Sequence, residues 1–321
     1  MSIFEAIVLG LIQGLTEFLP ISSSGHLRVF SALFGWPDPG AAFTAVSQLG
    51  TELAVVIYFR RRIGAIIATW SRSLVDRDLR RDINARMGWY VIIGTLPIVV
   101  LGLLFEEQID SAFRDLRLVA LTLIVFGVIL GLADRHTRKH RELVDLDARR
   151  GITFGFFQAL ALIPGVSRSG GTITGGMLLG FKRKDAAEYS FLLAIPAVFG
   201  SGLYKLKDIG GDEYAGVAAT VVGTAIAGVV GFAVIAWLMR FISTHSFMPF
   251  VYYRVALGIL VLTLVGFGVL DPHGGADADH PKKEIIAEEQ AARSSAEPAP
   301  SAEPGPDPSP APAPSAVPAV G

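Results

Sequence analysis

The sequence predicts an all-α integral membrane protein with six transmembrane helices and two re-entrant helix–loop–helix hairpins in an inverted-topology repeat. Three observations support this fold class. Of 321 residues, 51% are hydrophobic, only 18% are charged and 35 are Gly, which is lean in charge for a soluble protein. Six apolar stretches approach the ~20 residues that a helix needs to cross the hydrocarbon. Two further apolar stretches, 1–34 and 151–181, are interrupted midway by Pro, Gly and Ser.

The overall charge excludes some partners and sites. The net charge of −1 combines a tail, residues 271–321, that carries −6 with a body, residues 1–270, that carries +5. We expect no nucleic-acid partner, because no basic helix or aromatic RNA-binding motif accompanies this modest positive charge. The chain has no Cys, which excludes a disulfide framework, a zinc–thiolate site and a thiol nucleophile.

The first stretch does not resemble a secretory signal, because it lacks a basic start and Glu5, Gln13 and Glu17 interrupt it. The stretches that we expect to span the membrane come after it along the chain. Several are slightly short, which a locally thinned bilayer tolerates. The six predicted spans are 43–59, 89–105, 118–133, 189–203, 215–238 and 251–270.

The two interrupted stretches contain polar segments at 20–26 and 164–170, with the sequences PISSSGH and PGVSRSG. Irregular backbone at membrane depth is tolerated only where protein buries it or where it lines a wet cavity. Each stretch is therefore predicted to enter and leave the membrane from the same side, as a re-entrant hairpin.

The two hairpins resemble each other in sequence. Gln13 precedes Gly25 by twelve residues and Gln158 precedes Gly170 by twelve, with Pro and then Ser-x-Ser-Gly between them. This similarity indicates an internal repeat. The loop predicted at 60–86 holds eight Arg and three Asp, so the positive-inside bias places it in the cytoplasm. Both termini then lie outside, and the oppositely inserted hairpins are expected to meet near the bilayer midplane.

The tail, 271–321, is rich in Pro, Ala and acidic residues and holds 11 of the 18 prolines. Such a composition buries too little apolar surface to offset its chain entropy, so the tail is predicted to be disordered. A dispensable extension is favoured over a spacer that crosses the wall. Residues 1–270 are predicted to form the polytopic membrane catalytic domain.

Gln13 and Glu17 are candidate metal ligands in the first hairpin. They lie four residues apart and so share one face of a helix. A carboxylate beside an amide oxygen suits a hard divalent cation such as Mg²⁺. The alternative is that Glu17 is a protonated carboxyl group hydrogen-bonded to a loop amide.

The turn that follows places Ser22, Ser23 and Ser24 before Gly25 and His26. Hydroxyls and amides of such a turn can hold a phosphate, and the next helix adds partial positive charge from its N-terminus. A Ser within reach of a His is the minimum for nucleophilic or general-base catalysis. Alternatively, the serines satisfy a re-entrant backbone and His26 is a packed donor.

The second turn places Ser167, Arg168, Ser169 and Thr172 together. A guanidinium at membrane depth requires an anion, and its planar fork matches phosphate. The alternative partner is Glu17, and the substrate phosphate can displace or bridge that ion pair. For Glu52, four residues after Gln48, a hydrogen bond between helices is favoured over a place in the cavity.

The motifs Q-x-x-x-E-F-L-P-x-S-S-x-G-H, from Gln13 to His26, and P-G-x-S-R-S-G, from Pro164 to Gly170, resemble the signatures of the undecaprenyl-pyrophosphate phosphatase (bacitracin-resistance) family. The resemblance covers roughly 1–270 and not the tail. It implies an enzyme of the bacterial cell membrane that hydrolyses undecaprenyl diphosphate, recycles the carrier for peptidoglycan synthesis and confers bacitracin resistance. It also implies a divalent cation, Mg²⁺ or alternatively Ca²⁺, at Gln13 and Glu17. Gln instead of Glu at position 13 lowers the charge of that site.

The predicted mechanism uses Ser23 as the attacking hydroxyl or as a direct phosphate ligand, and His26 as general base or as acid for the leaving group. Arg168 neutralises the phosphoryl oxygens, which is the main need of phosphoryl transfer. The site is expected to open to the outer side. A water activated by His26 remains an alternative nucleophile. The further predicted phosphate-binding residues are Ser22, Ser24, Ser167, Ser169 and Thr172.

Two other functions compete with the phosphatase hypothesis. Inverted repeats with broken helices are also typical of transporters, so a flippase for a polyprenyl phosphate lipid is the main alternative. Type-2 phosphatidic-acid phosphatases share a Ser-Gly-His element, but this chain lacks their Ser-Arg-x₅-His motif. Membrane lipids are expected partners, and the sequence leaves a homodimer open.

Overall fold

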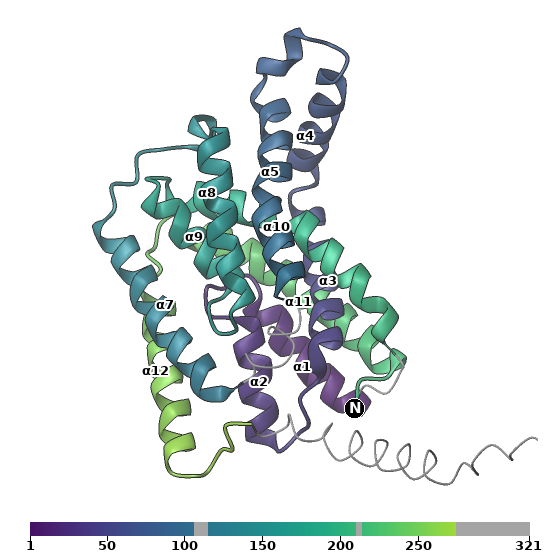
Figure 1. Ribbon diagram of the computed structural model, residues 1–321, viewed down its shortest axis with the longest axis vertical. Coiled ribbons are helices and arrows are strands. Elements are labelled where there is room, and N and C mark those ends of the chain that lie inside the picture. Colours follow the sequence, from purple (N-terminus) through teal and green to yellow (C-terminus); the bar gives the residue numbers. More distant parts are fainter. Residues whose placement is uncertain (106–114, 210–213, 274–321) are drawn as a thin grey trace, which may run out of the picture. The chain divides into compact units, whose positions relative to one another are not determined.

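The computed structural model describes residues 1–105, 115–209 and 214–273 (Figure 1). These residues form helices and loops, with no strand longer than one isolated bridge between Arg141 and Phe181. Residues Met1–Ala278 form one unit, and the second unit, Asp279–Gly321, lies outside the described part. The predicted disorder of the tail therefore stays a prediction, because only its first three residues are described.

Six helices of the described residues are long and apolar enough to cross a membrane, which confirms the predicted number. Their ends differ from the predicted ends by one to six residues, and capping side chains set the first residue of α5 and of α7. For example, α5 begins at Ile83 where the Asp82 side chain accepts a hydrogen bond from Asn84 N. The six are α3 (Gly40–Tyr58), α5 (Ile83–Leu104), α7 (Leu116–His136), α10 (Arg183–Lys205), α11 (Val217–Phe241) and α12 (Met248–Gly266).

The basic segment 60–86, which we expected to be a loop, contains the helix α4 (Arg60–Ser73) and a short 3₁₀ helix, η1 (Asp78–Arg81). Helix α4 packs on α5 (Figure 1). Trp70 of α4 forms two contacts with α5. It lies against Gly88, where an added Cβ would be 2.7 Å from the Trp70 ring, and its ring is edge-on to that of Trp89. The prediction of a loop was wrong, because α4 packs one face of an amphipathic helix on α5. The high Arg content of the segment does not indicate such a helix.

Both interrupted stretches form a helix, a turn and a second helix. The first consists of α1 (Ile3–Thr16) and α2 (Ser23–Phe34). The second consists of α8 (Ala148–Ala159), the 3₁₀ helix η4 (Leu160–Leu162) and α9 (Arg168–Leu178). In both turns the residue before the second helix is a Ser with positive φ, +75° at Ser22 and +72° at Ser167. Its Oγ accepts a hydrogen bond from the backbone N–H three residues on.

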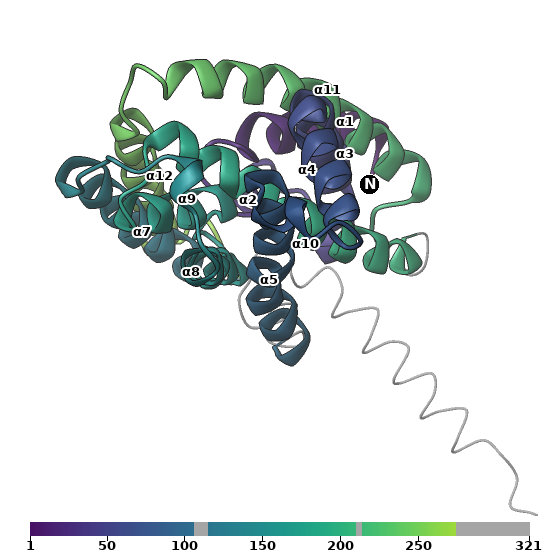
Figure 2. The same cartoon turned by 90° about the horizontal axis from the view of Figure 1, so that it is seen from above.

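Glycine contacts bring the helices close together. Helix α11 packs on α1 and α3, α12 on α7, and α5 on α8 (Figure 2). Gly50 of α3 lies directly against the backbone of Thr224 and Gly228 in α11, and Gly223 lies against Phe43. Small residues allow such approaches between membrane helices. The glycines of α11 at 223, 228 and 231 therefore form a close packing surface.

Replacing Gly155 by Val is expected to destabilise the protein by about 1–3 kcal/mol, because overpacking of a tight contact costs that much. A Cβ at Gly155 would overlap the carbonyl oxygen of Gly94 where α8 meets α5. The measurement is the thermal midpoint of the detergent-solubilised variant. Gly200→Val serves as the control, because an added Cβ meets nothing within 4 Å there. An unchanged midpoint for Gly155→Val would contradict the close packing.

Candidate active site

Glu17 is the central group of the site. It caps the C-terminus of α1 and its exposed fraction is only 6%. Its Oε1 forms an ion pair with Nη2 of Arg168, the first residue of α9. Its Oε2 accepts hydrogen bonds from Gln13 Nε2 at 2.7 Å and from Ser23 Oγ at 2.6 Å. One buried carboxylate thus joins both turns.

A second buried carboxylate faces the same guanidinium. Glu52 Oε2 of α3 lies 4.0 Å from Nη2 of Arg168, and Glu52 is 1% exposed. Its Oε1 has no hydrogen-bond partner among the described residues. With both carboxylates ionised, they and the single guanidinium carry a net charge of −1 in a buried site. Such a site needs a proton or a cation before it accepts a phosphate anion.

Glu17, Arg168 and the serines of both turns line a cavity of about 480 Å³. The rest of its lining is mostly apolar and comes mainly from α5 and α10, including Val99, Leu103 and Val198, with Lys205 as a further charged group. The cavity therefore pairs a charged, hydroxyl-rich region with an apolar wall. The predicted site residues that line it are Glu17, Ser22, Ser23, Ser24, Ser167 and Arg168.

The other two predicted phosphate-binding residues are engaged with main chain and do not line this cavity. Ser169 Oγ donates to Leu19 O at 3.1 Å and so links the second turn to the first. Thr172 is fully buried, and its Oγ1 donates to Arg168 O at 2.7 Å. Ser169 therefore links the two turns, and Thr172 bonds within α9.

His26 lies on the other side of the first turn. Its Nδ1 is 2.7 Å from Ser22 O, and its Nε2 is 2.8 Å from the hydroxyl of Tyr253. Because a carbonyl only accepts, Nδ1 carries the proton, and in the neutral ring Nε2 accepts from Tyr253. His26 and Tyr253 line an apolar cavity of about 740 Å³ beside α1, α11 and α12. The hydroxyl of Ser23 bonds to Glu17, not to the imidazole.

The oxygen atoms around Glu17 suit a hard divalent cation. Gln13 is fully buried, its Nε2 donates to Glu17, and its Oε1 has no hydrogen-bond partner in the described structure. Glu52 has an equally unpartnered oxygen. No cluster of three His, Cys, Asp or Glu that would hold a metal by itself occurs in residues 1–105, 115–209 and 214–273. A cation here would depend on few protein oxygens and on ligands from water or substrate.

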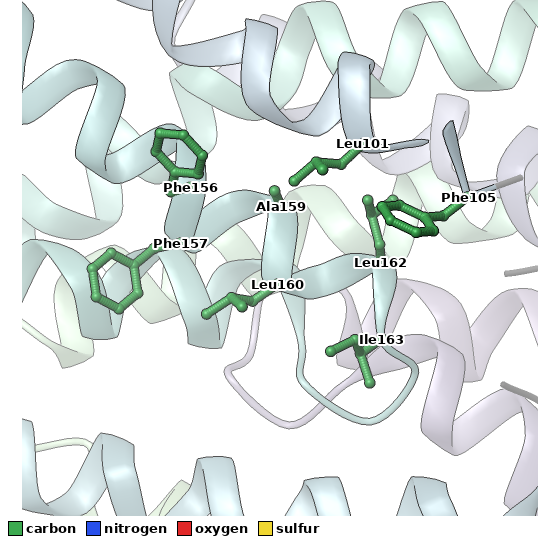
Figure 3. A pocket seen from close by; sticks show the side chains of 8 residues that line it. All are labelled: Leu101, Phe105, Phe156, Phe157, Ala159, Leu160, Leu162 and Ile163. Carbon is green, nitrogen blue, oxygen red and sulfur yellow. The ribbon is translucent and has the colours of Figure 1, made fainter. Parts of the chain in front are cut away.

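Beside the polar cavity lies an apolar groove, whose lining side chains are drawn in Figure 3. It has a volume of about 430 Å³ and lies between the end of α5 and the α8–η4 segment. Leu162 lines both this groove and the polar cavity. The remaining residues of the groove are Leu101, Phe105, Phe156, Phe157, Ala159, Leu160 and Ile163.

The model of the family described as "Bacitracin resistance protein BacA" matches residues 6–260. The chain belongs to the bacitracin resistance protein BacA family. It is 72% identical over 289 residues to the undecaprenyl-diphosphatase of Thermobifida fusca, covering 90% of this chain and 99% of that one. It is 56% identical to undecaprenyl-diphosphatase 2 of Streptomyces coelicolor, covering 85% and 98%. It is 59% identical to the undecaprenyl-diphosphatase of Clavibacter michiganensis, covering 84% and 99%.

The BacA family match includes five of the six apolar helices and the first 13 residues of α12, and the chain is accordingly a multi-pass membrane protein. It also includes three residues near the turns to which the sequence prediction gave no role or only a minor one. Glu52 faces Arg168, Tyr253 bonds to His26, and Arg254 bonds to both turns. A charge inside an apolar stretch was the available signal for Arg254, because such charges are usually functional. Nothing local indicated which groups these side chains would meet.

Proposed function

We propose that this chain hydrolyses undecaprenyl diphosphate to undecaprenyl phosphate and inorganic phosphate. This activity recycles the lipid carrier for peptidoglycan synthesis and confers bacitracin resistance. The observation that carries the proposal is the cavity in which Ser23, Glu17 and Arg168 adjoin a largely apolar wall. Such a cavity suits a diphosphate headgroup with a polyprenyl chain. The BacA family membership and the relatives named undecaprenyl-diphosphatase support the same reaction.

In the proposed mechanism Ser23 is the nucleophile. Its Oγ already donates to Glu17 Oε2 at 2.6 Å, so Glu17 is placed to take the proton. The Ser23 oxygen forms a bond to the terminal phosphorus, and the bond from that phosphorus to the bridging oxygen breaks. Undecaprenyl phosphate leaves, and water then hydrolyses the phosphoserine to release inorganic phosphate.

Arg168 binds the phosphoryl oxygens. In the structure it pairs with Glu17, and a substrate phosphate would take over that partner or share it. The N-termini of α2 and α9 and the hydroxyls of Ser22, Ser24 and Ser167 border the same cavity and would donate to the phosphate. Charge neutralisation by such fixed donors is the main source of catalysis in phosphoryl transfer.

His26 acts on the first turn from behind. Its bond to Ser22 O orients the backbone next to Ser23, and Tyr253 orients the imidazole in turn. The role of His26 as general base or as acid for the leaving group would require the ring to exchange Tyr253 for a substrate or water partner. We therefore assign the first proton transfer to Glu17 and a supporting role to His26.

Gln13 and Glu17 would hold a divalent cation, with Mg²⁺ expected and Ca²⁺ the alternative, and Glu52 would be a further ligand. The cation would supply positive charge to the diphosphate oxygens. The support is chemical. Gln13, Glu17 and Glu52 present side-chain oxygens, and the Oε1 atoms of Gln13 and Glu52 have no hydrogen-bond partner among the described residues. The cation would also offset the net negative charge that Glu17, Glu52 and Arg168 carry when both carboxylates are ionised.

The two helix–turn–helix segments are proposed to be re-entrant hairpins of an inverted-topology repeat. The 14 residues of α1 extend about 21 Å, which is too short for a hydrocarbon core of ~30 Å. The basic segment 60–86 would lie in the cytoplasm, which leaves both termini and the opening of the site on the outer side of the bacterial cell membrane. Membrane lipids surround the spans, and one copy supplies every site residue named here.

The proposed activity is tested by phosphate release from undecaprenyl diphosphate by the purified protein in detergent, with and without EDTA. We expect release without any second compartment, loss of most activity in EDTA, and recovery when Mg²⁺ is restored. Activity that EDTA leaves intact would overturn the metal proposal but not the phosphatase. Absence of phosphate release, together with lipid movement across reconstituted vesicles, would favour the flippase.

Replacing Ser23 by Ala is expected to lower the turnover number by at least about 10³-fold, because the nucleophile is removed. Rapid quenching of the unaltered protein should also trap a phosphoserine at this position by mass spectrometry. Ser24→Ala is the matched control and should lose far less, because it removes one of several donors to the phosphate and leaves the nucleophile in place. Substantial turnover by Ser23→Ala would instead identify water as the nucleophile.

A further inference from the structure

Arg254 is the largest of the fully buried side chains, with an exposed fraction of 0% in the middle of α12. Its guanidinium donates to four backbone carbonyl oxygens. Nη1 donates to Pro20 O at 3.0 Å in the first turn. Nη2 donates to Gly165 O at 2.8 Å and Val166 O at 3.0 Å in the second turn. Nε donates to Leu123 O of α7 at 3.2 Å.

These contacts adjoin the reacting groups on both sides. Pro20 lies between Glu17 and Ser23 in the chain, and Val166 lies two residues before Arg168. Among the described residues, Arg254 forms no ion pair with a carboxylate. A buried cation is costly unless hydrogen bonds satisfy it. The carbonyls of the two turns therefore have to remain together around this guanidinium.

The surrounding chain leaves room for the guanidinium. An added Cβ at Gly170, in the first turn of α9, would lie 2.9 Å from Nη1 of Arg254. An added Cβ at Gly127 of α7 would lie 3.3 Å from the Arg254 Cβ. The preceding residue, Tyr253, holds His26. The N-terminal half of α12 thus contacts both turns, and Arg254 does so without lining the polar cavity.

We propose that Arg254 is a positioning residue that sets the spacing of the two turns, and so aligns Ser23 and Glu17 with Arg168. The inference rests on the proposed hydrolysis. The fork of a guanidinium can reach four carbonyls in three segments, whereas the ammonium of Lys is a compact group with three donors. A misplacement of ~1 Å between reacting groups can cost about 10²-fold in rate.

The test compares Arg254→Met and Arg254→Lys with the unaltered protein in the phosphate-release assay. We expect Arg254→Met to lower kcat about 10²-fold and Arg254→Lys about 10-fold, with KM changed less than about 3-fold, because alignment acts on the transition state. Thermal midpoint and elution volume report the folded fraction, and kcat is counted per folded molecule. Arg240→Met, at the exposed end of α11, is the control and should keep full activity.

A kcat per folded molecule within about 3-fold of the unaltered protein in both variants would overturn the proposal, because the role would then be purely structural. A raised KM with unchanged kcat would also overturn it, by assigning Arg254 to substrate binding. If Arg254→Met does not fold, Arg254→Lys, which keeps the charge and the aliphatic stem, decides alone. No phosphate release by the unaltered protein would instead refute the proposed function.

Discussion

Replacing Arg168 by Ala is expected to reduce phosphate release by about 10³-fold or more, the largest effect of any single substitution at a charged residue here. The guanidinium lines the cavity and pairs with Glu17 there, and transition-state charge on phosphoryl oxygens needs such a donor. Ala also leaves Glu17 without its counter-ion, which adds an unpaired buried carboxylate. The measurement is kcat/KM per folded molecule.

The control for this substitution is Arg138→Ala, at an exposed position after α7, which should leave the rate unchanged. Arg168→Lys should recover only part of the activity, because an ammonium does not match phosphate with a planar fork. Elution as a single species would show that the Arg168→Ala protein is intact. Near-normal turnover by an intact Arg168→Ala variant would refute the site assignment.

Replacing Glu17 by Gln is expected to lower kcat by about 10²–10³-fold, the range for loss of a general base together with a misplaced nucleophile. The substitution keeps the shape but removes the charge that accepts from Ser23 and pairs with Arg168. An amide can no longer accept the Ser23 proton. Weaker Mn²⁺ binding, followed by electron paramagnetic resonance, should accompany the loss if Glu17 is a metal ligand.

Glu142→Gln is the matched control, because Glu142 forms an exposed ion pair with Lys182 away from the turns. It should change neither kcat nor Mn²⁺ binding, since surface pairs contribute little. Glu17→Gln turnover close to that of the unaltered protein would assign the base elsewhere, with His26 the next candidate. Loss of turnover with unchanged Mn²⁺ binding would separate the proton-transfer role of Glu17 from metal binding.

Sequence patterns predicted the spans well and the partners of site residues less well. The six apolar runs were sufficient for α3, α5, α7, α10, α11 and α12, because apolarity over ~20 residues is a local property. The same patterns indicated an ion pair between Glu17 and Arg168 as one alternative, and the structure contains it. They suggested His26 as the partner of Ser23, whereas the structure places Glu17 there. The assignment of His26 as the general base therefore stays a prediction.

The sequence by itself determined that the chain is an apolar, helical membrane protein with polar turns rich in Ser at 20–26 and 164–170. Only the tertiary structure decided which groups meet at those turns. His26 meets Tyr253 across 227 residues, and Arg254 meets Pro20 across 234. Contacts at such separations depend on how α12 packs beside α7 and the turns, and composition and periodicity report only the local environment of each segment.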